Sequence, residues 1–242
     1  ADTILAYVGL APIHLIKGYK SADLVNTPIR LRNMNEVQNL VGYTDNWEKF
    51  TLCEAFTAHF NNTVHNAGPI YIINVFNPDI HRGEEITLAE QDFSRGYVYL
   101  DTDEAIIDTV KIEGKVIDVD YSVNYDFAEG KVVIKALKPL TDSETIKYFP
   151  IDLSDITENT IIGSSNADGS VSGIQAIKLL YPKFNAVCNL LAAPGYSEKP
   201  AVYQAMVAAV QKINGHWNGF VIADIPLVDG DDAIDTKEKA IA

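Results

Sequence analysis

The chain has 242 residues, 47% hydrophobic and 21% charged, which is typical of a globular protein with an ordinary core. Its formal net charge is −14, so we expect the surface to repel phosphate backbones and anionic lipid, which argues against nucleic-acid and membrane partners. We find no apolar run long enough to span a bilayer and expect no signal peptide. Cys53 and Cys188 both lie in apolar segments, and we expect them to be buried small hydrophobes rather than a disulfide framework.

The first third of the chain alternates between strand and helix patterns. Strand patterns cover residues 3–16 and 27–31, and helix patterns cover residues 35–41, which Gly42 closes, and 47–61. The run from Ile70 to Phe76 is apolar throughout, which favours a central strand that is covered on both faces. A helix that leads into such a strand is typical of an α/β fold.

Residues 94–150 have a different pattern, with short alternating runs separated by turn residues. Tyr121, Val123 and Tyr125 alternate with polar residues, and a turn at 126–130 leads into the apolar run 131–135, which predicts a β-hairpin. Further strands are predicted at 106–112 and 145–149. We therefore expect a discontinuous α/β domain, formed by residues 1–93 and 151–242, and a small inserted β domain, formed by residues 94–150.

The α/β pattern returns near Asp155. We predict a short strand at 161–163, a polar loop at 164–173, a helix at 174–181 and a buried strand at 184–193. Ser197 stands where a helix N-cap is expected and Pro200 falls in the first turn, so a helix should run from Ala201 to the stop at 214–215. A strand at 220–225 completes a βαβ unit with parallel strands, and residues 236–242 match the start of one more helix.

Several stretches of this sequence resemble one protein family. They are LLAAPGYS (190–197) with GFVIADIP (219–226), AYVGLA (6–11), the segment 33–77, and the segment 161–176. Together they are similar to the core of tail sheath proteins of contractile-tailed bacteriophages, which also occur in prophages and contractile bacteriocins. The resemblance covers most of the chain outside residues 94–150.

The resemblance implies a subtilisin-like α/β sandwich that carries a β-sandwich-like insert at this place. It also implies a structural subunit that polymerises around the tail tube and contracts to drive the tube through a bacterial envelope. The implied partners are further copies of the chain, the tail tube protein, and the baseplate and tail terminator proteins, in a virion tail assembled in the host cytoplasm. No catalytic residue, cofactor or metal is implied. Residues 1–5 would belong to a connecting arm, and because the family's C-terminal domain is not in this sequence, we expect a fragment.

An α/β enzyme is the competing interpretation, with a site at the strand ends 74–77, 193–197 and 223–226. A subtilisin-like core requires a check for a Ser/His/Asp triad, and the candidates are Ser197, His216 and Asp224. APGYSEK is not a Gly-x-Ser-x-Gly elbow, and nothing in the spacing brings the three side chains together. A third interpretation is a non-viral adhesion or scaffold module that uses the β insert as its binding surface.

Phosphate and metal motifs are weak. The loop from Gly163 to Gly173 contains glycines but matches neither a P-loop nor a dinucleotide fingerprint. His59 and His65 are too far apart for a helical ligand pair, and we see no clustered ligands beside the other histidines (His14, His81 and His216). The acidic segment 229–235 does not follow the order of an EF-hand loop, so we expect no dedicated metal site.

Overall fold

The computed structural model describes residues 3–62 and 67–225, together with two short strands beyond them. Its strands are β1 (Leu5–Gly9), β2 (Pro28–Leu31), β3 (Ile70–Asn74), β4 (Ile86–Gln91), β5 (Tyr97–Leu100), β6 (Lys111–Ile112), β7 (Tyr121–Asp126), β8 (Lys131–Ala136), β9 (Glu144–Tyr148), β10 (Leu190–Ala192), β11 (Phe220–Ile222), β12 (Val228–Asp229) and β13 (Asp232–Ala233). Its α-helices are α1 (Ser21–Leu24), α2 (Met34–Leu40), α3 (Leu52–Phe60), α4 (Glu158–Ile162), α5 (Leu180–Phe184) and α6 (Pro200–Val210), and its 3₁₀ helices are η1 (Ile13–Leu15), η2 (Ile107–Thr109) and η3 (Gly173–Leu179). The protein is therefore mixed α/β.

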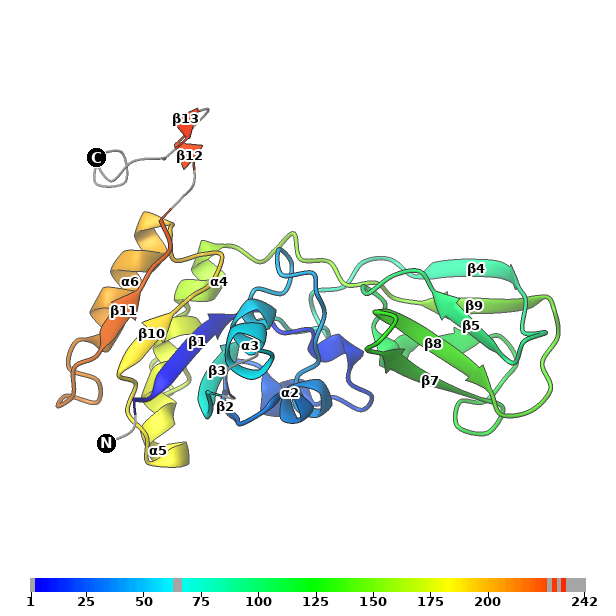
Figure 1. The fold of residues 1–242 in the computed structure, drawn as a ribbon, viewed down its shortest axis with the longest axis horizontal. Helices are drawn as coiled ribbons and strands as arrows, with labels where there is room; N and C mark the ends of the chain where they lie inside the picture. The colour runs from blue at the N-terminus through cyan, green and yellow to red at the C-terminus, as the bar shows by residue number, and fades with distance from the viewer. Residues whose placement is uncertain (1–2, 63–66, 226–227, 230–231, 234–242) are drawn as a thin grey trace.

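A five-stranded sheet with the order β11-β10-β1-β3-β2 organises the α/β part (Figure 1). β1 runs parallel to β10 and to β3, β10 runs parallel to β11, and β2 is antiparallel to β3. The parallel pairing of β10 and β11 across α6 confirms the predicted βαβ unit. Every residue of β3 is buried, which confirms that this apolar strand is covered on both faces.

The two faces of the sheet are covered by different helices. On one face α6 contacts β10 and β11, and η3 contacts β1, β2 and β3. On the other face α3 packs against β1, where Gly9 is needed because a Cβ there would meet the Thr51 side chain at 2.5 Å. Strand alternation places Leu5 and Tyr7 on the α3 face, and the register aligns Tyr7 with Ala192 and Ala192 with Ile222. The face of the sheet that α3 covers at β1 therefore continues over β10 and β11, beyond the helix.

Several predicted boundaries and elements are wrong. Residues 161–163, predicted as a strand, lie in and just after α4, which begins with a capping box of Thr157 and Thr160. In the predicted strand at 106–112, residues 107–109 form the 3₁₀ helix η2, and only the last two residues form β6. The predicted strand at 184–193 is confined to β10, and the predicted helix at 174–181 is η3 followed by α5. The helix predicted at 236–242 lies outside the described residues.

Residues 86–148 contain two antiparallel sheets, with the orders β4-β9-β6 and β5-β8-β7. The β7–β8 hairpin is confirmed, with Tyr121, Val123 and Tyr125 buried in alternation. The two sheets share a hydrophobic core that is distinct from the core around the five-stranded sheet, and Figure 1 shows them at the opposite end of the molecule from α6. The first strand of these sheets, β4, precedes residue 94, where the predicted boundary stood.

Polar contacts join the α/β part to the β-sheets. His14 donates from Nε2 to the carbonyl oxygen of Asp103 at 2.7 Å, and the backbone N–H of Gly18 donates to the Asp108 carboxylate at 2.9 Å. Lys49 and Glu104 form an ion pair at the same junction. Leu15, which lies in η1, is buried in the core of the β-sheets. The junction is therefore fixed by both hydrogen bonds and apolar packing.

Candidate functional site at the carboxyl ends of the parallel strands

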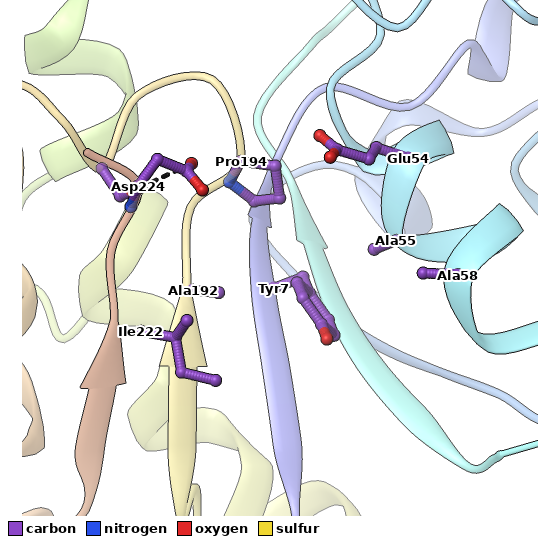
Figure 2. A pocket seen from close by; sticks show the side chains of 9 residues that line it. Tyr7, Glu54, Ala55, Ala58, Ala192, Pro194, Ile222 and Asp224 are labelled. Atoms are coloured by element: carbon purple, nitrogen blue, oxygen red, sulfur yellow. Dashed lines mark hydrogen bonds between the residues drawn. The ribbon is translucent and has the colours of Figure 1, made fainter. Parts of the chain in front are cut away.

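A hollow of about 160 Å³ lies on the α3 face of the sheet, at the carboxyl ends of β10 and β11 (Figure 2). Its polar lining residues are Tyr7, Glu54, Ser197 and Asp224. Its apolar lining residues are Ala55, Ala58, Ala192, Pro194 and Ile222. In Figure 2 the carboxylates of Glu54 and Asp224 lie on either side of Pro194, and the Tyr7 ring lies between α3 and the strands. Two of the three strand ends that the enzyme interpretation named, 193–197 and 223–226, therefore supply part of this lining.

Ser197 and Asp224 form a hydrogen-bonded pair across 27 residues of chain. The Ser197 hydroxyl donates to Asp224 Oδ2 at 2.9 Å and accepts from the Asp224 backbone N–H at 2.9 Å. Ser197 is only 2% exposed. The prediction that Ser197 caps a helix is wrong, because α6 begins after Lys199 and has no side-chain cap. Its hydroxyl instead ties the loop after β10 to the loop after β11 and holds the Asp224 carboxylate in place.

The third triad candidate lies elsewhere. His216 precedes β11 at its amino end, and its ring contacts Trp217 with centroids 5.7 Å apart. The structure therefore brings Ser197 and Asp224 together, which no spacing in the sequence indicated, but it does not bring the three triad candidates together. Among the described residues, both hydrogen-bond partners of the Ser197 hydroxyl belong to Asp224. The pair therefore joins the two loops, and among the described residues no imidazole is placed to accept the Ser197 proton.

Tyr7 and His59 form a second polar pair behind the hollow. The Tyr7 hydroxyl lies 2.7 Å from His59 Nε2, and His59 Nδ1 lies 2.8 Å from the carbonyl oxygen of Ala67. A carbonyl only accepts, so the neutral imidazole carries its proton on Nδ1, and Tyr7 donates to Nε2. Burial raises the pKa of the Tyr7 phenol. No pattern in the sequence indicates this pair, since the two residues lie on different elements 52 positions apart.

Asn74, at the third strand end of the enzyme interpretation, has a structural role. Its Oδ1 accepts from the backbone N–H groups of Ala11 and Phe76, and its Nδ2 donates to the carbonyl oxygen of Phe76. The side chain is fully buried. Asn74 therefore satisfies backbone hydrogen-bonding groups just after β1 and β3. Both its amide oxygen and its amide nitrogen already have partners.

The glycines at the two ends of the 163–173 loop pack against other backbone. Gly163 has φ +69°, and a Cβ there would lie 1.9 Å from the Ser172 carbonyl oxygen. Gly173 has φ +52°, and its Cβ would lie 2.3 Å from the Ile161 carbonyl oxygen. The polar loop between them closes on itself through an antiparallel bridge of Ser165 and Val171. Close backbone approach explains these glycines without a phosphate.

The histidines and cysteines lie in separate environments. Within the described residues no group of three His, Cys, Asp or Glu side chains is placed to hold a metal ion. His65 and most of the 229–235 segment lie outside those residues. Cys53 and Cys188 are buried, as predicted, and burial raises the pKa of both thiols to about 12. Burial also lowers the pKa of His14 to about 4 and lowers that of His81.

The edge of the sheet beside the hollow is apolar and exposed. β11 ends the strand order and pairs with β10 alone among the described strands. Phe220 is 76% exposed, Ile222 49% and Ile225 60%. Since Phe220 N–H donates to Asn189 O on the β10 side, strand alternation directs the N–H and C=O of Val221 outward. An edge without charged side chains or proline is a template for another strand.

The predicted arm at residues 1–5 is contradicted for Ile4 and Leu5, while residues 1–2 lie outside the described residues. Leu5 belongs to β1, and the backbone N–H of Ile4 donates to Asn189 Oδ1 at 2.9 Å.

In the described part of the chain, no helix is long and apolar enough to cross a membrane. No protein-family model, curated protein or solved structure matches the chain.

Proposed function

We propose that this chain is a structural subunit of a contractile phage-type tail sheath. Many copies polymerise around a tail tube, and contraction of the sleeve drives the tube through a bacterial envelope. The α/β part then corresponds to a subtilisin-like sheath core, and the two sheets between β3 and α4 correspond to its inserted β domain. The other partners are the tail tube protein, the baseplate and the tail terminator, and the assembled subunit is located in the virion tail.

The observation that carries this proposal is the exposed edge strand β11. Phe220 and Ile222 present apolar side chains next to an outward-facing Val221 backbone that no described strand pairs. In a monomer such an edge promotes aggregation, whereas in an assembly it accepts an extended segment of a neighbour by strand addition. Main-chain hydrogen bonds then hold one subunit to the next.

Two further features support a mechanical role. A sleeve that contracts needs subunits that move as rigid bodies between two alternative packings. The junction of His14, Gly18 and Lys49 with the β-sheets, together with Leu15 in their core, fixes the two parts of the chain to each other. The resemblance to sheath proteins described for the segments around β1, α3, β3, η3 and the βαβ unit also supports this proposal.

Electron microscopy of the complete gene product tests the proposal, with Val221→Pro as the diagnostic variant. Proline removes the outward N–H but leaves the β10 ladder intact, and proline is tolerated on edge strands. We expect rods or tubes from the wild type and from Val221→Thr, which retains the N–H, and dispersed particles from Val221→Pro. Circular dichroism checks that the proline variant is folded. Rods of normal length from a folded Val221→Pro would reject strand addition at β11.

A further inference from the structure

The side chains around the hollow offer hydrogen-bond acceptors and no free donor. Glu54 and Asp224 contribute carboxylates, and neither forms an ion pair within the described residues. The Ser197 proton is directed to Asp224 Oδ2, and the Tyr7 proton is directed to His59 Nε2. A group that enters the hollow must therefore bring its own donors.

The negative charge of the hollow also favours a ligand that brings hydrogen-bond donors. Two carboxylates at the hollow, on a chain of net charge −14, repel phosphates and carboxylates. A cation is attracted to both carboxylates, and the face of the Tyr7 ring adds to this attraction if the cation lies over it. The ligand that suits this hollow is therefore a cation that carries several N–H donors.

The volume of the hollow and its lining residues indicate that the ligand is a single amino-acid side chain. The hollow holds about 160 Å³, which is below the roughly 300–1,000 Å³ of pockets for drug-sized ligands. Ala55, Ala192 and Ile222 provide an apolar wall for a methylene stem. Lysine combines such a stem with a compact ammonium group that donates three hydrogen bonds, whereas the guanidinium of arginine is a larger planar fork.

The position of the hollow indicates where the lysine comes from. Ile222 is the last residue of the exposed edge strand β11, and Asp224 lies two residues further along the chain. A strand from another subunit that pairs with β11 would run beside the mouth of the hollow and present alternate side chains on the α3 face. Strand addition and occupation of the hollow are therefore compatible in one contact.

We propose that the hollow binds a lysine side chain of a second copy of this chain, with the ammonium group between the carboxylates of Glu54 and Asp224. The stem packs on Ala192 and Ile222. The assignment of the lysine to a second copy rests on the proposed sheath function, but the cationic chemistry of the hollow does not.

Titration of the ¹⁵N-labelled chain with n-butylammonium, observed by NMR, tests the chemistry. We expect saturable shifts at Ala192 and Ile222 with n-butylammonium, and none with n-butanol or butyrate at the same concentrations. Glu54→Gln and Asp224→Asn should each weaken binding about fivefold. The amide oxygen introduced by Asp224→Asn still accepts from Ser197, so the fold is retained. Glu48→Gln, an exposed residue outside the hollow, is the matched control and should bind as the wild type does.

Two results would overturn the chemistry: equal shifts with n-butanol, or unchanged affinity in the Glu54→Gln/Asp224→Asn double variant. Electron microscopy of the complete gene product tests the source of the lysine, because the double variant should give fewer or shorter rods than Glu48→Gln. Normal rods from a double variant that has lost n-butylammonium binding would reject the second copy. An absence of rods from the wild type would reject the proposed function and the second copy together, while the titration alone decides the chemistry of the hollow.

Discussion

The buried imidazole of His14 should make the stability of the protein depend on pH in a specific window. His14 is fully buried, stacks on Phe50 with centroids 5.2 Å apart and contacts Phe76 edge-on at 5.6 Å. Its Nε2 donates to the Asp103 carbonyl, and its Nδ1 has no hydrogen-bond partner within the described residues. A proton on Nδ1 would place an unsatisfied charge in this aromatic cluster, which is why burial lowers the pKa of His14 to about 4.

The magnitude follows from the two pKa values. The pKa of His14 falls from 6.5 to about 4, and one pKa unit corresponds to about 1.4 kcal/mol, so the coupling is about 3 kcal/mol. Above pH 6.5 the imidazole is neutral in the folded and unfolded chain, and stability is fully present. As the pH falls toward 4 the unfolded chain binds the proton first, so the free energy of unfolding decreases by about 3 kcal/mol across this window.

Urea unfolding at a series of pH values from 7 to 4 measures this effect when wild type is compared with His14→Gln. Glutamine retains an N–H donor for Asp103 but does not titrate, so the stability difference between the two proteins should shrink by about 3 kcal/mol as the pH falls to 4. Phe50→Leu, which destabilises the same cluster without adding or removing a proton site, should run parallel to the wild type. Parallel curves for wild type and His14→Gln would refute the assignment of a neutral, buried His14.

Three other substitutions or reactions test the roles assigned above. Asn74→Leu should lower the free energy of unfolding by about 3 kcal/mol or more in urea titrations, because it leaves several buried backbone groups unpaired; a loss below about 1 kcal/mol would contradict that role. Gly163→Ala should destabilise far more than Gly169→Ala, since both have positive φ but only Gly163 meets backbone at 1.9 Å; equal thermal shifts would contradict this. Cys53 and Cys188 should react with a thiol reagent at pH 8 only at the rate of unfolding, because both thiols are buried with a pKa of about 12; fast labelling of the native protein would contradict it.

The fold was predictable where one local pattern dominated. The uniformly apolar run of β3 and the alternation of β7 specify strands by themselves, and Asn33 with Glu36 forms the start of α2. The errors occur where a local side chain or a distant partner decided the structure. Thr109 donates from its hydroxyl to the Ile106 carbonyl and turns a predicted strand into η2. The Leu52 N–H donates to Leu10 across the fold, and α3 begins there instead of at residue 47.

The candidate site was less predictable than the fold. Ser197 has the local sequence of a helix cap, yet its hydroxyl bonds to Asp224, 27 residues away. The Tyr7–His59 pair likewise joins β1 to α3. Such contacts depend on strand order and register, which no spacing in the sequence specifies. The apolar edge strand was visible as a run of hydrophobic residues, but only the order of the strands shows that it lies at the edge.

The most direct test of the account is electron microscopy of the purified complete gene product, with the Val221→Pro variant beside it. If the chain functions by binding copies of itself at β11, the wild type forms rods or tubes of uniform diameter and the proline variant remains dispersed. A wild-type protein that stays monomeric at all concentrations would contradict the account, and a ligand-dependent rise in its melting temperature would favour the enzyme interpretation.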